Sequence, residues 1–144
     1  MALEQMHGDE TPAGKNAIDE VTAMFFSAFS NLNGVPPDVD VLYRLFIPEA
    51  IIISNSGTAP VIYDVAGFAE PRRALLTGGS LVDFSEWETS ESTEIFGNIA
   101  HRFSRYEKSW TASGEKCAGR GAKTIQFIRT RAGWQIVSLA WADE

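Results

Sequence analysis

Apolar residues near the N-terminus recur at the spacing of an α-helix. They stand three or four residues apart, at Ile18, Val21, Phe25, Phe29 and Leu32. This spacing puts all of them on one helical face, and the Asn33-Gly34 and Pro36-Pro37 steps that follow favour a helix end. The pattern therefore predicts a long first helix with an aromatic buried face.

A second, shorter helix is predicted directly after the first. Asp38 can cap this helix, which covers residues 39–46 and ends at Pro48. The β-branched run at 50–54 then predicts a buried strand.

A third helix is predicted from Asp64 to Leu76. We interpret Asp64 as the cap of this helix rather than as a catalytic base, because it stands directly before the helical pattern. Pro71 lies inside the pattern and should kink or divide the helix near Gly67.

Two long strands are predicted at 82–96 and 99–110, joined by a two-residue turn. The first carries acidic side chains and no basic ones, whereas basic side chains dominate the second, so opposite charges favour the pairing. The turn sets His101 beside Glu94. A polar connection at 111–121 should lead into the last hairpin.

The chain ends in a hairpin of two apolar-rich runs. Gly133 can take the positive φ that closes the turn between them. The pairing then sets Gln126 opposite Ser138 and Ile128 opposite Ile136. At least half of the residues on each face are apolar, so we expect the sheet to be covered on both sides.

This order of elements predicts an α+β domain: a curved antiparallel sheet wrapped around the long N-terminal helix, with two shorter helices. A chain of 144 residues is long enough for one domain with a sizeable core. We assign residues 15–144 to that domain and residues 1–14 to a disordered lead-in.

Composition narrows the class of protein. The formal net charge of −7 argues against nucleic acid and anionic membranes as partners. No apolar run reaches the roughly 18 residues of a membrane span. Residues 1–14 lack the basic start and apolar stretch of a signal peptide, so we expect a cytoplasmic protein. The single cysteine, Cys117, excludes an internal disulfide, and no motif marks it as a nucleophile.

The chain resembles the nuclear-transport-factor-2-like superfamily. The resemblance covers residues 15–144 and rests on the helix-rich first half, the strand after the second helix, and the closing run Gly133-Trp134-Gln135-Ile136-Val137. This cone-shaped, cystatin-like fold also includes the SnoaL-like polyketide cyclases, steroid isomerases, scytalone dehydratase and the association domains of calcium/calmodulin-dependent kinases. Further segments are similar to a bacterial branch of the superfamily, namely Arg120-Gly121, Ile125-Gln126, Arg129-Thr130 and Trp141-Ala142-Asp143-Glu144.

The resemblance implies a cone-shaped pocket between the first helix and the concave face of the sheet. It also implies a homodimer through the convex face. We expect that convex face to carry Phe127, Val137, Leu139 and Trp141. The fold hosts enzymes and non-catalytic modules alike, so it does not define the function.

The candidate catalytic residues are His101, Tyr43 and Tyr106. A carboxylate such as that of Glu94 can orient the His101 ring for general acid–base work, although the pair could equally be a surface contact. A tyrosine hydroxyl can polarise a carbonyl group, but a tyrosine ring also packs in a core with its hydroxyl at the edge. Tyr63 is a further candidate of this kind.

The candidate ligand-binding residues are Phe25, Phe29, Arg102, Gln126, Trp134 and Ser138. Gln126 and Ser138 interrupt an apolar face, so they either satisfy each other or contact a ligand. Arg102 could bind an anionic group, or it could form a surface ion pair with Glu91.

Two functions follow from these residues. The first is a cofactor-independent enzyme that moves protons on a small, mostly apolar substrate, as an isomerase, dehydratase or cyclase does. The alternative is a non-catalytic ligand-binding or dimerisation module. The sequence lacks the glycine-rich phosphate loop, the dinucleotide fingerprint and the H-E-x-x-H motif, so we expect no cofactor and no metal.

Overall fold

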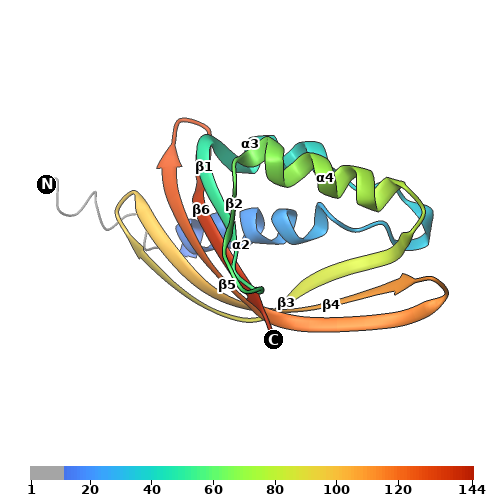
Figure 1. Ribbon diagram of the computed structural model, residues 1–144. Helices are drawn as coiled ribbons and strands as arrows, with labels where there is room; N and C mark the ends of the chain where they lie inside the picture. The colour runs from blue at the N-terminus through green and yellow to red at the C-terminus, as the bar shows by residue number, and fades with distance from the viewer. Residues whose placement is uncertain (1–11) are drawn as a thin grey trace, which may run out of the picture.

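The long N-terminal helix is α2 (Pro12–Ser27), which lies against the concave side of a curved sheet (Figure 1). The computed structural model describes residues 12–144. Residues 1–11 of the expected lead-in lie outside the described residues, and residues 12–14 already belong to α2.

Six strands form the sheet in the order β2-β1-β6-β5-β4-β3. Their bounds are β1 (Phe46–Ser54), β2 (Val61–Tyr63), β3 (Leu81–Phe96), β4 (Ile99–Ala112), β5 (Glu115–Thr130) and β6 (Gly133–Asp143). All neighbouring strands are antiparallel except β1 and β6, which run parallel. The α+β class and the curved sheet are as predicted. The short strand β2 and the parallel pair were not predicted.

The second predicted helix is shorter than expected. It consists of a 3₁₀ turn (Val39–Val41) followed by α3 (Leu42–Leu45), and Asp38 makes no side-chain cap bond. Phe46 instead begins β1 and pairs with β6, so sheet pairing ends the helix early. Pro48 lies at an irregularity of that pairing, where a residue without an N–H is tolerated.

The third predicted helix is α4 (Val65–Thr77). Asp64 caps it as expected and accepts a hydrogen bond of 2.7 Å from the Gly67 N–H. Pro71 lies inside α4, which continues as one helix rather than being divided.

α2 ends at Ser27 instead of Leu32 because Asn31 joins the chain to other elements. The buried Asn31 amide donates to one backbone carbonyl at the end of α4 and to another at the start of β3, each at 2.9 Å. Its side-chain oxygen accepts from the Phe84 N–H at 2.7 Å. These contacts require the chain to leave the helix before Asn31.

Strands β3 and β4 pair as predicted, with Glu94 opposite His101. An irregularity after Glu88 shifts the register by one residue, so Glu88 lies opposite Tyr106. The predicted polar connection at 111–121 is mostly strand, because a tight turn at Ser113-Gly114, with positive φ at both residues, already closes the β4–β5 hairpin.

The last hairpin closes at Gly133, whose φ of +100° is in the expected region. Gln126 lies opposite Ser138 as predicted, but Phe127 rather than Ile128 lies opposite Ile136. One extra residue in β6, Val137, causes this shift. Such a bulge moves every residue on one side of it to the other face of the strand.

The two faces of the sheet differ sharply. The inner face, toward α2, carries buried residues that include Ile125, Phe127, Ile136 and Leu139. The outer face carries His101, Phe103, Thr124 and Gln126, which are exposed. The expectation that Phe127, Leu139 and Trp141 form a convex outer face is therefore wrong, since β5 and β6 turn these residues toward the helices.

Candidate functional site

A cavity of about 160 Å³ opens between α2, α4 and the inner face of the sheet. Its walls are mostly aromatic and aliphatic, and four charged side chains reach it. The apolar lining consists of Phe25, Phe29, Phe68, Leu75, Leu76, Leu81, Phe84 and Trp141. The charged lining consists of Arg72, Glu86, Lys108 and Lys123. An apolar cavity with a few convergent polar groups is the usual form of a small-molecule site, so we take this cone as the candidate functional site.

Lys123 is the most buried charged group of the cone, with 5% of its surface exposed. It lies on the inner face of β5, opposite Trp141 of β6. Its Nζ lies 3.3 Å from Oε1 of Glu86 and 4.2 Å from the centre of the Tyr106 ring. Burial lowers the pKa of the Lys123 amine because it disfavours the charged form, although Glu86 opposes the shift.

A second ion pair, between Lys108 and Asp143, lies beside the pair of Lys123 and Glu86. Lys108 Nζ is 3.0 Å from Oδ1 of Asp143, and the Tyr106 hydroxyl donates to the same carboxylate. Burial and this hydrogen bond raise the pKa of Tyr106 well above its ordinary value, so the hydroxyl stays protonated. Burial alone would raise the pKa of Asp143, but the bonds from Tyr106 and Lys108 outweigh it and lower that pKa.

Arg72 enters the cone from α4 and stacks on aromatic rings. Its guanidinium carbon lies 4.0 Å from the centre of the Phe68 ring and 5.4 Å from those of Tyr63 and Trp141. Burial lowers the pKa of this half-buried group. Within residues 12–144, Arg72 has no carboxylate within ion-pair distance. Its guanidinium donates to the Phe68 carbonyl at 3.1 Å and also interacts with the Tyr63 hydroxyl.

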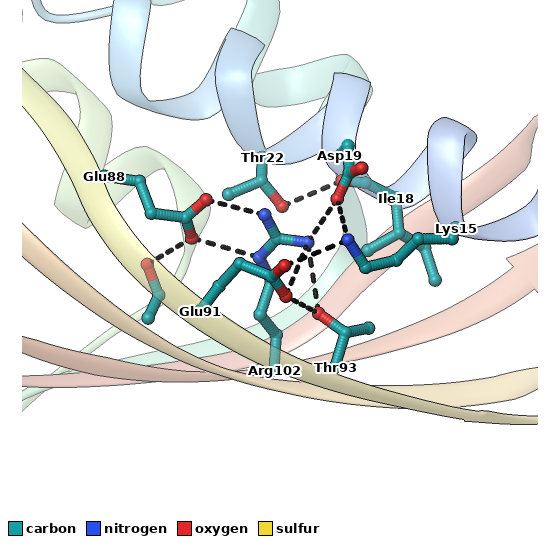
Figure 2. Close-up of polar contacts among 9 residues, drawn as sticks. Lys15, Ile18, Asp19, Thr22, Glu88, Glu91, Thr93 and Arg102 are labelled. Atoms are coloured by element: carbon teal, nitrogen blue, oxygen red, sulfur yellow. Dashed lines mark hydrogen bonds and ion pairs between the residues drawn. The ribbon is translucent and has the colours of Figure 1, made fainter. Parts of the chain in front are cut away.

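Arg102 lies outside the cone, in a polar network that joins α2 to β3 and β4. Figure 2 shows its guanidinium between Glu88, Glu91 and Asp19. Nε and Nη2 donate to the two Glu88 oxygens at 3.0 and 2.6 Å, and Nη1 donates to Asp19 at 2.7 Å. Arg102 is 3% exposed, so it forms a buried network and not the surface pair that the sequence suggested.

Asp19 and Glu91 bind a second cation at the edge of the same network. Lys15 Nζ lies 2.8 Å from Asp19 and 3.0 Å from Glu91 (Figure 2). Burial would raise the pKa of Asp19, but hydrogen bonds from Lys15 and Arg102 lower it overall. We assign this network to the attachment of α2, because its donors and acceptors already bind one another.

His101 lies on the outer face, away from the cone. Its Nε2 is 2.7 Å from Oε1 of Glu94, as the strand register predicted, and the His101 side chain is 60% exposed. Gln126 and Ser138 are on the same face and bond each other at 3.2 Å. These residues line two depressions of the outer face, of about 550 and 360 Å³, which are separate from the aromatic cone.

The other predicted site residues are divided between the cone and the surface. Phe25 and Phe29 line the cavity, and the Tyr106 ring adjoins it. Trp134 is buried at the far end of β6 and does not line the cavity. Tyr43 is exposed, and its hydroxyl donates to Glu70.

Sequence reasoning missed Arg72, Glu86, Lys123 and Trp141. A signal for Lys123 was present, because Lys123 is in phase with the apolar Ile125 and Phe127 in a strand of period two. A charged residue on a buried face is rare unless it is paired or functional. No such signal marks Arg72 or Glu86, which come from a helix and a strand far away in the sequence.

The described residues contain no helix long and apolar enough to cross a membrane. They also contain no group of three or more histidine, cysteine or acidic side chains arranged around a common metal position.

Comparisons with solved structures identify the fold. A nuclear transport factor 2 (NTF2-like) superfamily protein from Salmonella enterica serovar Typhimurium superposes with a TM-score of 0.71 over 88% of both chains, at 15% identity. A conserved protein from Planctomyces limnophilus gives a TM-score of 0.74 at 18% identity, over 93% of this chain and 98% of the other. A protein with a cystatin-like fold from Nostoc punctiforme gives 0.71 at 13% identity, over 93% of both chains.

The chain therefore has the nuclear-transport-factor-2-like, cystatin-like fold that the sequence resemblance implied. No protein-family model and no curated protein sequence matches it. Identities of this size define the fold alone, so the function has to be argued from the cone itself.

Proposed function

We propose that this protein is a small-molecule pocket protein of the SnoaL-like type, whose cone binds a small, mostly apolar compound that carries a carboxylate. Arg72 is the observation that carries the proposal. It is a half-buried guanidinium in the cone with no carboxylate partner among the described residues. A ligand carboxylate would supply the missing partner, since guanidinium and carboxylate match in a bidentate geometry.

The charges of the lining support an anionic ligand. Glu86 pairs with Lys123, and Lys108 pairs with Asp143, which leaves the charge of Arg72 in excess. The chain as a whole has a net charge of −7. A cone with surplus positive charge on an acidic protein therefore favours an anion locally.

The size of the cavity limits the apolar part of the ligand. A dry protein cavity of about 150 Å³ holds a benzene molecule, and this cone measures about 160 Å³. A single ring or a branched chain of similar volume fits against Phe25, Phe68 and Trp141. If the protein is a cofactor-independent enzyme, this compound would be its substrate. If the protein is a binding module, the compound would be bound without being changed.

Calorimetric titration with phenylacetate and with its neutral isostere phenylacetamide tests the proposal. We expect the acid to bind roughly tenfold to a hundredfold more tightly, because a hydrogen bond to a charged group contributes about 1.5–3 kcal/mol. Arg72→Met should abolish this preference while keeping the apolar stem. Arg73→Met, which changes the adjacent arginine that pairs with Asp40 and Glu70, is the matched control and should keep it.

Two results would overturn the proposal. One is equal affinity, or no measurable affinity, of the native protein for the acid and the amide. The other is an acid preference that persists in Arg72→Met.

A further inference from the structure

Lys123 is a buried amine that ligand binding through Arg72 does not explain. It lies on the inner face of β5 and lines the same cavity as Arg72. The Nζ atom is 5.3 Å from the centre of the Trp141 ring, and the Arg72 guanidinium carbon is 5.4 Å from the same centre. A single small ligand in the cone can therefore reach both groups.

The surroundings of Lys123 suit a reactive amine better than a permanent ammonium group. Aromatic rings surround it, with those of Phe25 and Phe26 each 5.6 Å from Nζ. Only the Glu86 carboxylate lies within ion-pair distance of it in the described part of the chain. Burial in apolar surroundings favours the neutral amine, which is the nucleophilic form. A lysine placed in this way is a recurrent carrier of imine chemistry.

We propose that Lys123 forms an imine with the carbonyl carbon of a small aldehyde or ketone bound in the cone. This inference rests on the proposed function, and it narrows the ligand class to oxo-acids: Arg72 binds the carboxylate, and Lys123 attacks the carbonyl group.

The proposed step is balanced with the groups present. Glu86 takes a proton from the Lys123 ammonium, and the neutral nitrogen forms a bond to the carbonyl carbon. The carbonyl oxygen becomes a hydroxyl group. The proton of this hydroxyl comes from the nitrogen, which gives up its second proton. Glu86 then returns its own proton to the hydroxyl, water leaves, and the nitrogen lone pair closes the C=N bond, which gives the protonated imine. Glu86, 3.3 Å from Nζ, lies where this proton transfer requires it.

Reductive trapping tests the inference on the native protein. The protein is incubated at pH 7.5 with one equivalent of 4-formylbenzoate, reduced with cyanoborohydride, and analysed by intact mass and peptide mapping. An exposed lysine has about one amine in a thousand unprotonated at this pH. We therefore expect one lysine adduct per chain, with occupancy at Lys123 at least about tenfold above that at Lys15, Lys108 or Lys116; the N-terminal amine, about a third of which is neutral at this pH, is mapped separately.

Three variants control the result. Lys123→Met should lose the adduct, and Lys116→Met, at an exposed lysine of β5, should keep it. Lys123→Met alone leaves Glu86 buried without its partner. The double variant that combines Glu86→Gln with Lys123→Met is therefore made as well. A native circular dichroism spectrum of that pair shows that loss of the adduct is not loss of the fold.

The same preparations are titrated with phenylacetate, which separates the two proposals. Phenylacetate binding without an adduct at Lys123, or with adducts spread over the surface amines, overturns the imine and leaves the binding function in place. If the protein neither binds phenylacetate nor forms an adduct at Lys123, the proposed function and the imine are both overturned. An adduct confined to Lys123 supports the inference.

Discussion

The backbone of Gly121 lies directly against the Tyr106 hydroxyl. Tyr106 of β4 and Gly121 of β5 are cross-strand partners, and Gly121 also lies opposite Asp143 of β6. A Cβ atom at position 121 would be 2.5 Å from the Tyr106 Oη and would also collide with the Ala142 carbonyl. Glycine is therefore needed here to admit the Tyr106–Asp143 contact beside the cone.

Gly121→Ala should destabilise the protein by about 1–3 kcal/mol, the usual cost of overpacking a rigid site. The free energy of unfolding in urea measures this cost. Gly57→Ala is the control, because nothing lies within 4 Å of a Cβ atom at that exposed loop position. Equal stability of the two variants would show that the strands move apart without cost.

Among the elements, α2 depends on the network around Arg102. This network is the polar part of the contact between the helix and the long strands, and Arg102 lies at its centre (Figure 2). Removing one member of a buried ion pair leaves the other charge without a partner, which costs more than the pair contributes.

Arg102→Met should therefore lower the free energy of unfolding by about 3 kcal/mol, the low end for buried pairs, since Asp19 is partly solvated. Arg105→Met changes an arginine on the outer face of the same strand and is the matched control. Urea unfolding of both variants provides the measurement. If Arg102→Met lowered the free energy of unfolding no more than Arg105→Met does, the network would not stabilise the protein.

The same network makes stability depend on pH. Asp19 has a lowered pKa in the folded state, as does Glu91, mainly through its bond from Thr93. Their stabilisation is present above the unfolded values of about 4 and is lost as the pH falls through the folded values. Unfolding followed from pH 7 down to pH 3 should show this loss, and Arg102→Met should show a smaller one. An equal loss of stability with falling pH in the native protein and in Arg102→Met would contradict the assignment of the pH dependence to this network.

At the scale of the whole molecule, the outer face of the sheet carries exposed apolar side chains. Strand pairing and alternation place on this face Ile51 (51% exposed), Ile62 (68%), Phe96 (53%), Ile99 (59%) and Phe103 (43%). Exposed apolar side chains favour an interface with another chain, although Ser138, Gln126 and His101 lie in the row that separates Ile51 from β3. We keep the expectation of a homodimer through the convex face, and we assign it to these residues in place of Phe127, Leu139 and Trp141.

Phe103→Glu should convert the dimer to the monomer of 15.8 kDa, because a symmetric interface would bury the new charge twice. Light scattering at micromolar concentration measures the mass. Val35→Glu is the control, since Val35 is 62% exposed in the loop after α2 and does not belong to the strands of the outer face. A native protein that already has the monomer mass would refute the dimer.

Several elements were predictable because their causes are local. Asp64 caps α4, Gly133 closes the last hairpin with a positive φ, and opposite charges set Glu94 beside His101. In each case the residues that decide the structure lie within a few positions of each other. The spacing of apolar residues and the residue types in the turns were therefore sufficient to predict the long strands β3, β4 and β6 and the α+β class.

The cone itself was decided only by the tertiary structure. The bulge at Val137 brings Trp134 and Ile136 onto the face of β6 that carries Leu139 and Trp141, and packing against the helices turns this face inward. Lys123 and Trp141 therefore line the cone, while Gln126 and Ser138 lie on the outer face. Arg72 meets the pair of Glu86 and Lys123 across α4, β3 and β5. A one-residue shift of register inverts a strand, and contacts between distant segments leave no local pattern. The sequence by itself therefore determined the elements and their order, and packing alone determined which of their side chains share a cavity.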